Sequence, residues 1–296
     1  MERALFTLTS SESKRLVGKA IANLPEVTRA YKDGIVFIAT STASAYVAEE
    51  LLNVTIEEKG FFTAGVVVPR GFCLTSQERR QSLHYGYIGV NKGMISHNLT
   101  RADLLETWLP EMDHDDVFIK GANAIDPSGT AAIALGAGGR SRGGGGTIGS
   151  VIGAVTCRGI RLIIPASLEK LVPCSLVDVA PTVGGPFTYV AGLPSGMIAL
   201  KGKLVTEIQA FQTLTGVTAI PIAAGGVSGA EGCHTFIVGG TVDEVEKAWA
   251  LYKAVKGEPP ITTVTMNCDE CERGCSFNID PELIELRKTR DILGGY

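Results

Sequence analysis

The chain has 296 residues, of which 45% are hydrophobic and 20% charged, so it can bury a sizeable core, and this composition argues against global disorder. The net charge of −4 argues against nucleic acid as a partner, although a small anion held by local groups remains compatible with it. No signal peptide or membrane-spanning run is visible, and seven cysteines, an odd number, fit reduced thiols. We therefore expect a soluble, cytoplasmic protein without a membrane partner.

The first two hundred residues alternate helical and strand patterns, which predicts a mostly parallel sheet covered on both faces. A capping box, Thr9-Ser-Ser-Glu12, opens the first helix, and a second helix begins at Pro25 and ends at Gly34. Strands are expected at 35–39, 61–68, 117–119, 131–135 and 161–165. Further helices are expected after residue 44 and at 102–109, 148–155 and 167–172.

From residue 201 onward the pattern changes to strand, helix, strand, strand, helix, strand, which is the ferredoxin-like order. The strands are expected near 197–202 and at 217–223, 234–238 and 261–266, and the helices at 205–214 and 242–256. The predicted fold is α/β, with a doubly wound, mostly parallel sheet and a ferredoxin-like α+β subdomain. We assign 1–200 to the main domain, 201–266 to the small domain, and 267–296 to a cysteine-containing tail whose helix, at 281–292, docks on the main domain.

Glycine makes up eight of the fourteen residues from 136 to 149, and Arg140 and Arg142 lie among them. Glycine-rich turns before a helix suit anions because backbone N–H groups can approach closely, and arginine adds forked donors. The ligand-binding candidates in this tract are Arg140, Arg142, Gly144, Gly145 and Gly146. A flexible surface loop is the alternative. The tract also matches G-x-G-x-x-G, but it lacks the acidic residue expected about 20 residues later in a dinucleotide fold.

A second candidate cradle follows the strand at 35–39. Hydroxyl groups gather at the turn into the next helix, on Thr40, Ser41, Thr42 and Ser44. Hydroxyls and N–H groups at such a turn can hold a phosphate or a carboxylate, and the same residue types also serve as ordinary helix N-caps. Both interpretations stay open.

Lys120 ends the strand at 117–119, and Gly121 and Asn123 follow it. Beside an anion cradle, this lysine could bind phosphate or carboxylate, or lose its charge by burial and act as a nucleophile. A solvent-exposed lysine at a strand end is the alternative. Glu169 and Lys170 could join the same site, or form an ordinary exposed pair.

The order of these segments, with ATSTASAYVAEEL, DVFIKGANAID, the glycine tract and LIIPASLEKLV, resembles the superfamily of ribose-5-phosphate isomerases, glucosamine-phosphate deaminases and CoA transferases. In the isomerases a G-T-G-S-T turn holds the sugar phosphate, and Ala39 to Ala43 is its nearest equivalent here. Their K-G-G-G-G is similar to Arg142 to Gly146, and their Ser-Lys strand end to Ser167 to Lys170. The resemblance spans residues 1 to 265 and includes the isomerases' small domain. Lactate-utilisation proteins are also similar.

The resemblance implies a phosphosugar or an acyl/CoA-type ligand, with one departure in the catalytic motif. The isomerase D-G-A-D-E motif supplies aspartates, whereas Lys120-Gly-Ala-Asn123-Ala stands here. Because enediol isomerisation needs a carboxylate base, conventional pentose-phosphate isomerase activity is not expected. The candidate catalytic residues are Lys120, Asp126 and Glu169, although Asp126 is equally a turn residue in Ile-Asp-Pro-Ser-Gly.

The tail holds Cys268-Asp-Glu-Cys271-Glu-Arg-Gly-Cys275. Three thiolates at this spacing can hold zinc or an iron–sulfur cluster, and Cys233 or His234 is a possible fourth ligand. A redox-active pair, or thiols without a ligand, are the alternatives. His84, His97 and His114 show no metal-ligand spacing.

Two functions follow from these patterns. The first is an enzyme that binds a small anionic metabolite at the glycine-rich cradle. The alternative is a non-catalytic ligand or metal/redox sensor that uses the cysteine cluster. We also expect a homo-oligomer.

Overall fold

The computed structural model describes residues 1–136, 145–271 and 274–290, and it has the mixed α/β fold that the sequence predicts. The central sheet has six strands in the order β12-β10-β7-β2-β5-β6. Its first four strands are mutually parallel. Strand β5 runs antiparallel to β2, and β6 runs antiparallel to β5. In sheet order, the bounds are β12 Lys203–Val205, β10 Arg161–Pro165, β7 Val117–Ile119, β2 Ile35–Ile38, β5 Tyr87–Asn91 and β6 Met94–Leu99.

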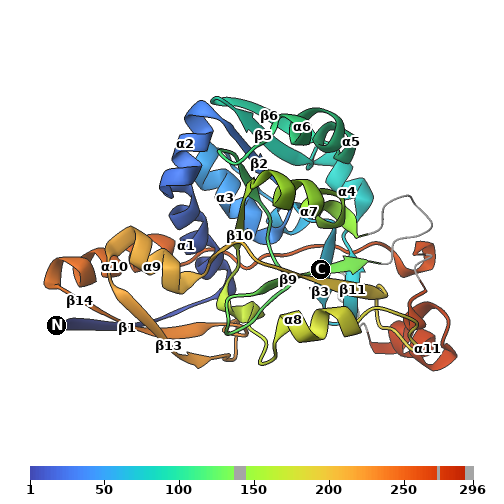
Figure 1. Cartoon of the computed structure of the whole chain (residues 1–296). Coiled ribbons are helices and arrows are strands. Elements are labelled where there is room, and N and C mark those ends of the chain that lie inside the picture. The colour runs from blue at the N-terminus through green and yellow to red at the C-terminus, as the bar shows by residue number, and fades with distance from the viewer. Residues whose placement is uncertain (137–144, 272–273, 291–296) are drawn as a thin grey trace.

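The central strands are buried along their length because helices cover the sheet (Figure 1). Their apolar side chains meet across neighbouring strands, where Phe37 of β2 stacks on Phe118 of β7 with ring centroids 5.5 Å apart. The helices around them are α1 Ser10–Ala22, α2 Pro25–Asp33, α3 Thr42–Leu52 and α7 Gly146–Arg158. The predicted capping box of α1 is confirmed, since Thr9 and Glu12 each accept a hydrogen bond from the other's backbone N–H.

A small antiparallel sheet, in the order β1-β14-β13, lies at one end of the molecule (Figure 1). Its members are β1 Glu2–Leu8, β13 Thr218–Ala224 and β14 His234–Gly240, and α9 Glu207–Thr215 and α10 Val242–Val255 pack against it. The N-terminal strand pairs with β14 because Phe6 points inward and contacts the rings of Phe211 and Tyr252.

Two strands predicted for this sheet do not belong to it. The first, β11 Ser195–Leu200, pairs instead with β9 Ala131–Gly136, which also pairs with β8 Ala124–Ile125. The prediction of a strand at 261–266 is wrong, because only Thr265 of this segment makes a bridge, to Thr75. Its place beside β14 is taken by β1, whose pairing partner lies too far along the chain for local sequence patterns to indicate.

The outer face of the small sheet exposes apolar side chains. Leu5 and Ile220, which both pair with Ile237 of β14, are 61% and 55% exposed. The predicted homo-oligomer stays a prediction.

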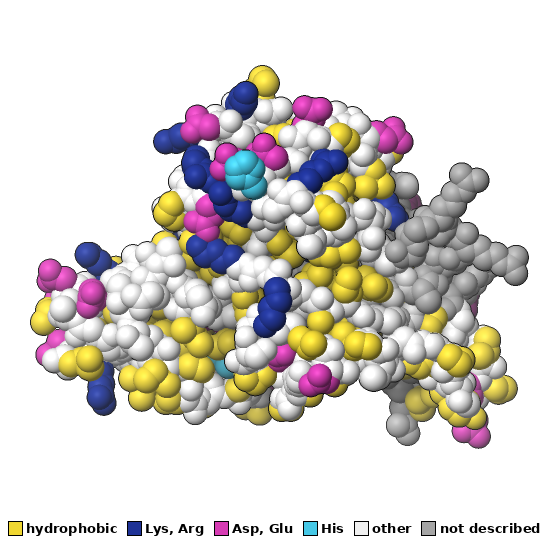
Figure 2. Space-filling view, in the orientation of Figure 1, with side chains coloured by type: hydrophobic (Ala, Val, Ile, Leu, Met, Phe, Trp, Pro, Cys, Tyr) yellow, Lys and Arg dark blue, Asp and Glu magenta, His cyan; other side chains and the backbone are white. Residues whose placement is uncertain are grey.

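Charged side chains of both signs are mixed on the face drawn in Figure 2. Acidic and basic groups interleave there, so neither sign of charge dominates this face.

A two-stranded antiparallel sheet and further helices complete the described part of the chain. They are η1 Lys59–Phe61, β3 Gly65–Val68, β4 Gly71–Leu74, α4 Gln77–Ser82, α5 Arg101–Asp103, the π-helix Leu104–Trp108, α6 Leu109–Glu111, η3 Leu168–Lys170, α8 Leu176–Val179, η4 Ala180–Thr182, η5 Cys268–Glu270, η6 Ser276–Asn278 and α11 Pro281–Arg290. Within the described residues, none of the helices is long and apolar enough to cross a lipid bilayer.

Candidate functional site

A cavity of about 1800 Å³ opens at the carboxyl ends of β2, β7 and β10. The segments that follow these three strands, 40–42, 120–123 and 169–170, all line it. Parallel neighbouring strands end at the same edge of a sheet, which is where open α/β proteins bind their ligands. The predicted turns therefore converge on one space.

Two helices begin at this cavity. Ser41 caps α3, and its hydroxyl accepts the N–H of Ser44 at 3.0 Å. Gly145 caps α7 in a left-handed conformation, with φ +94°, and supplies no side chain to accept the first N–H groups of the helix. Because a helix N-terminus carries partial positive charge, the start of α7 suits an anion.

Two lysine ammonium groups reach into the cavity and hydrogen-bond to backbone carbonyls. Lys120 Nζ donates to Thr40 O at 2.8 Å, and Lys170 Nζ donates to Ala122 O at 2.6 Å. Burial, and next the charge of Arg80, lower the pKa of Lys120 to about 8. Burial, and next the charge of Lys14, lower the pKa of Lys170 to about 8, and Lys120 contributes in the same direction.

Glu169 pairs with Lys14 of α1, whose Nζ lies 2.5 Å from Glu169 Oε1. Burial alone would raise the pKa of Glu169, but the charge and hydrogen bond of Lys14 outweigh it and lower the pKa to about 2. A carboxylate with this pKa is a weak proton acceptor at neutral pH. Glu169 therefore holds Lys14 in place more readily than it moves protons.

The charge of the cavity is opposite to that of the whole chain. Among the described residues, its charged lining groups are five cations and two carboxylates: Lys14, Arg80, Arg101, Lys120, Lys170, Glu169 and Glu231. An excess of cations around a concave site raises the local concentration of anions.

The structure brings most of the predicted ligand-binding residues together, and with them the catalytic candidates Lys120 and Glu169. Those that line the cavity are Thr40, Ser41, Thr42, Lys120, Gly121, Asn123, Gly145, Gly146, Glu169 and Lys170. Ser44 is fully buried behind Ser41, to which its hydroxyl bonds at 2.7 Å. Arg140, Arg142 and Gly144 lie outside the described residues. Ser41 therefore caps α3 and also lines the cavity, so the two interpretations of this turn are compatible.

Comparison with known protein families, curated proteins and solved structures finds no match to this chain.

Asp126 lies away from the cavity lining and organises a turn. Its Oδ1 accepts the N–H groups of Ser128 and Thr130, and its Oδ2 accepts the N–H of Leu176 at 3.0 Å. Burial alone would raise its pKa, but these hydrogen bonds, led by the Ser128 hydroxyl, lower it to about 2. The turn alternative that the sequence left open accounts for these contacts.

Lys14 and Arg80 were not among the predicted site residues. Lys14 lies on the apolar side of α1, at helical spacing from Val17 and Ile21, and only 6% of its side chain is exposed. A lysine at the helical spacing of core positions was the sequence feature that could have identified Lys14 as a site residue. Arg80, on α4, had no comparable signal.

The tail cysteines, Cys268, Cys271 and Cys275, line a second and much smaller cavity. Cys233 and His234, considered as the fourth ligand, are not among its lining residues. All seven cysteines lie in the described ranges, and none forms a disulfide.

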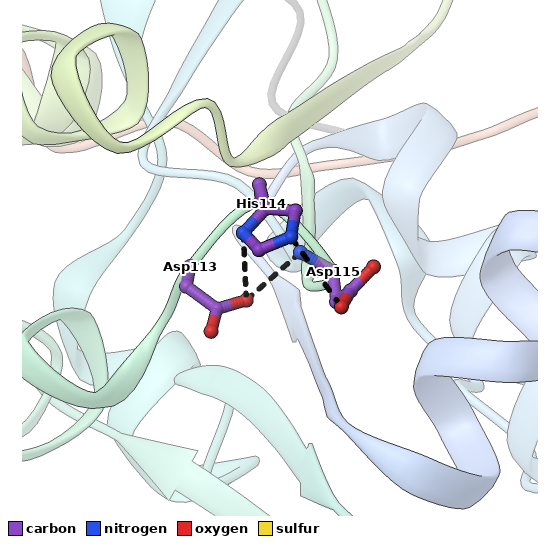
Figure 3. A group of neighbouring side chains, drawn as sticks. All are labelled: Asp113, His114 and Asp115. Carbon is purple, nitrogen blue, oxygen red and sulfur yellow. Dashed lines mark hydrogen bonds and ion pairs between the residues drawn. The ribbon is translucent and has the colours of Figure 1, made fainter.

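One other group of potential metal ligands lies on the surface, in the loop before β7. Ligand atoms of Asp113, His114 and Asp115 gather within 4.8 Å of one another (Figure 3). All three side chains are exposed, and Asp115 already pairs with Arg29 and Arg161. These ion pairs account for Asp115 without a metal, and Asp113 accepts the backbone N–H of Asp115.

Gly121 permits the close approach of two of the turns. A Cβ at this position would overlap the hydroxyl of Ser41, so Gly121→Ala displaces the cap of α3. We expect a loss of about 1 to 2 kcal/mol in the free energy of unfolding, measured with urea. Gly153→Ala is the matched control, because a Cβ there meets nothing within 4 Å and a helix favours alanine. Equal stability of the wild type and Gly121→Ala would contradict this packing.

Proposed function

We propose that this chain is an enzyme that binds a small anionic metabolite, a phosphosugar or an acyl/CoA-type compound, in the 1800 Å³ cavity. The observation that carries the proposal is the pair of half-buried ammonium groups, on Lys120 and Lys170, whose hydrogen-bond acceptors are carbonyls. A carbonyl carries only partial negative charge, and among the described residues neither lysine forms a salt bridge; Glu169, whose charge acts on Lys170, is paired with Lys14. An anionic ligand between the two lysines would supply a counter-ion.

The two helix N-termini support the same proposal. The caps of α3 and α7 both line the cavity, so the partial positive charges of both helices face the space that the lysines occupy. The resemblance to phosphosugar isomerases and CoA transferases motivates the choice of ligand classes. Their ligands carry phosphate or carboxylate groups, which this cavity suits.

The chemistry that we propose uses a lysine. An amine with a pKa of about 8 is partly neutral near physiological pH, so Lys120 or Lys170 can accept a proton from a carbon next to a carbonyl or add to the carbonyl itself. Glu169, tied to Lys14, positions the site. Conventional isomerase chemistry by paired carboxylates is not proposed.

A thermal-shift screen tests ligand binding. The panel contains inorganic phosphate, phosphosugars, CoA esters and 2-hydroxy acids, each with a neutral analogue. A ligand at a hundred times its Kd should raise the midpoint of unfolding by about 5 °C. No shift with any anion, from a sample that unfolds cooperatively, would contradict the proposal.

A second measurement separates the enzyme from a non-catalytic sensor. Each ligand found in the screen is incubated with the protein in deuterated buffer and followed by proton NMR. Exchange at a carbon next to a carbonyl, or formation of product, indicates catalysis. Binding without either supports the sensor, for which the cysteine-lined second cavity is the favouring observation.

A further inference from the structure

Four cysteines, not three, surround the small cavity near the C-terminal tail. Cys73 of β4 joins Cys268, Cys271 and Cys275 in lining a space of about 20 Å³. Cys73 lies far from the others in the sequence, so no spacing motif connects it to them. We propose that these four thiols form one metal centre, with Cys73 as the fourth ligand.

Three segments of the chain meet to build this site. The backbone N–H of Met266 donates to Leu74 O at 2.8 Å, which lays the start of the tail along β4. From the other side, Gly192 N donates to Cys275 Sγ at 3.0 Å. Gly192 has φ +97°, and a Cβ there would overlap the backbone of Phe72, so glycine is required for this approach. The sulfurs are therefore placed by long-range backbone contacts.

Asn278 fixes the loop that carries two of the cysteines. Its side-chain amide donates to the carbonyls of Cys268 and Cys271, at 2.7 and 2.8 Å. Such contacts hold the Cys-x-x-Cys turn in one conformation. A metal site benefits from ligands positioned in this way before the metal binds.

A buried guanidinium holds two of the four sulfurs in place. Arg70 is 9% exposed, and it donates to Cys73 Sγ at 3.3 Å, to Cys268 Sγ at 3.0 Å and to Met266 O. In the parts of the chain that the structure describes, no carboxylate pairs with it. Burial raises the pKa of the Cys73 thiol, against the opposing hydrogen bond and charge of Arg70. Thiolates bound to a metal would bring negative charge beside this buried cation.

The geometry bears on which metal the site takes. Among described residues, no three of these sulfurs lie within 4.8 Å of one another. A tetrahedral zinc ion, with Zn–S near 2.3 Å, would draw its four sulfurs to ~3.8 Å apart. A [4Fe–4S] cluster binds each cysteine to a separate iron and keeps the sulfurs further apart. The sulfur spacing thus favours a cluster, whereas a space of about 20 Å³ is closer to the size of one ion. The shared feature is four-thiolate ligation, and measurement decides between the two metals.

The site also contributes to the large cavity. Phe72, Leu74 and Leu193 line both spaces, and residues 260–263 and 265, which lead into the tail, line the large one. A metal at the four cysteines would hold the tail against β4 and so keep this wall of the large cavity in place.

Metal and acid-labile sulfide analysis of the full chain, purified without oxygen, tests the proposal. We expect one centre per chain, as either iron with equimolar sulfide or one zinc ion. Cys73→Ser should lose at least nine-tenths of the bound metal, and Cys174→Ser, at an exposed position, should keep it. A metal-free wild type, or undiminished metal in Cys73→Ser, would overturn the assignment.

Alkylation of the native wild type covers the case in which Cys73→Ser does not fold. Mass spectrometry should find Cys73, Cys268, Cys271 and Cys275 protected together, and all four reactive once a chelator has removed the metal. Reaction of Cys73 in the metal-loaded protein at the rate seen without metal would remove it from the site. Both measurements are made without a metabolite, so their outcome is separate from that of the proposed enzyme function.

Discussion

Lys120→Met is expected to weaken binding of the anionic ligand by roughly 30- to 100-fold at pH 7, which corresponds to about 2 to 3 kcal/mol for one charge-assisted contact. The same substitution should raise the free energy of unfolding of the ligand-free protein. Burial lowers the pKa of Lys120 from 10.5 to about 8, so the folded state holds the charged amine less favourably than the unfolded chain does. Methionine fills a similar volume without that charge.

This combination of weaker binding and greater stability identifies a residue that is kept for its ligand. Isothermal titration calorimetry gives the Kd, and urea unfolding gives the stability. Lys247→Met, on the exposed face of α10, is the matched control and should change neither. A Lys120→Met protein that binds normally would remove Lys120 from the proposed site.

The wild type should also show a matching pH dependence. Lys120 and Lys170 are charged below their pKa of about 8, so binding should be strongest near pH 7 and weaken by about tenfold for each pH unit above 8 for each charge lost. The ligand stabilises the charged amines, so binding near pH 8 should take up protons. An affinity that stays constant from pH 7 to pH 10 would contradict this assignment.

The position of the cavity can be predicted from the sequence because neighbouring parallel strands end at the same edge of a sheet. Each of β2, β7 and β10 has an apolar run that ends in polar or glycine residues, and strands that run in parallel place those ends at one edge. Lys120 was therefore predicted from its strand end, and Lys170 from its place after β10 together with the family resemblance. Neither needed knowledge of which helix packs where.

What the sequence does not predict depends on contacts between distant segments. Lys14 enters the cavity from α1, Cys73 meets the tail through β4, and β1 replaces the segment 261–266 beside β14. The strand-like composition of 261–266 is real, but its N–H and C=O groups bond to the chain around β4, as at Thr265. Local patterns fix which residues can pair, and the packing of the whole chain decides with which partner.

Glu207→Gln is expected to stabilise the protein by about 3 kcal/mol at pH 8 and to change little at pH 5. Glu207 is fully buried at the start of α9, and burial, against opposing hydrogen bonds, raises its pKa from 4.5 to about 7. A carboxyl with a raised folded-state pKa loses its contribution to stability as the pH rises from 4.5 through 7. Over this range the unfolded chain gives up its proton while the buried carboxyl still holds one, and the loss levels off above pH 7. Both of its oxygens accept the same N–H, that of Leu168, so the single oxygen of glutamine can keep this bond. The Ser13 hydroxyl, which bonds to Glu207, can accept from the new amide.

Urea unfolding from pH 5 to pH 8.5 should show a decline in stability for the wild type that is absent from Glu207→Gln. The same decline should be present in Glu246→Gln, an exposed control. Parallel curves for all three proteins would mean that Glu207 is already ionised in the folded state at pH 5, and that its surroundings supply a cation or donors beyond Leu168 and Ser13.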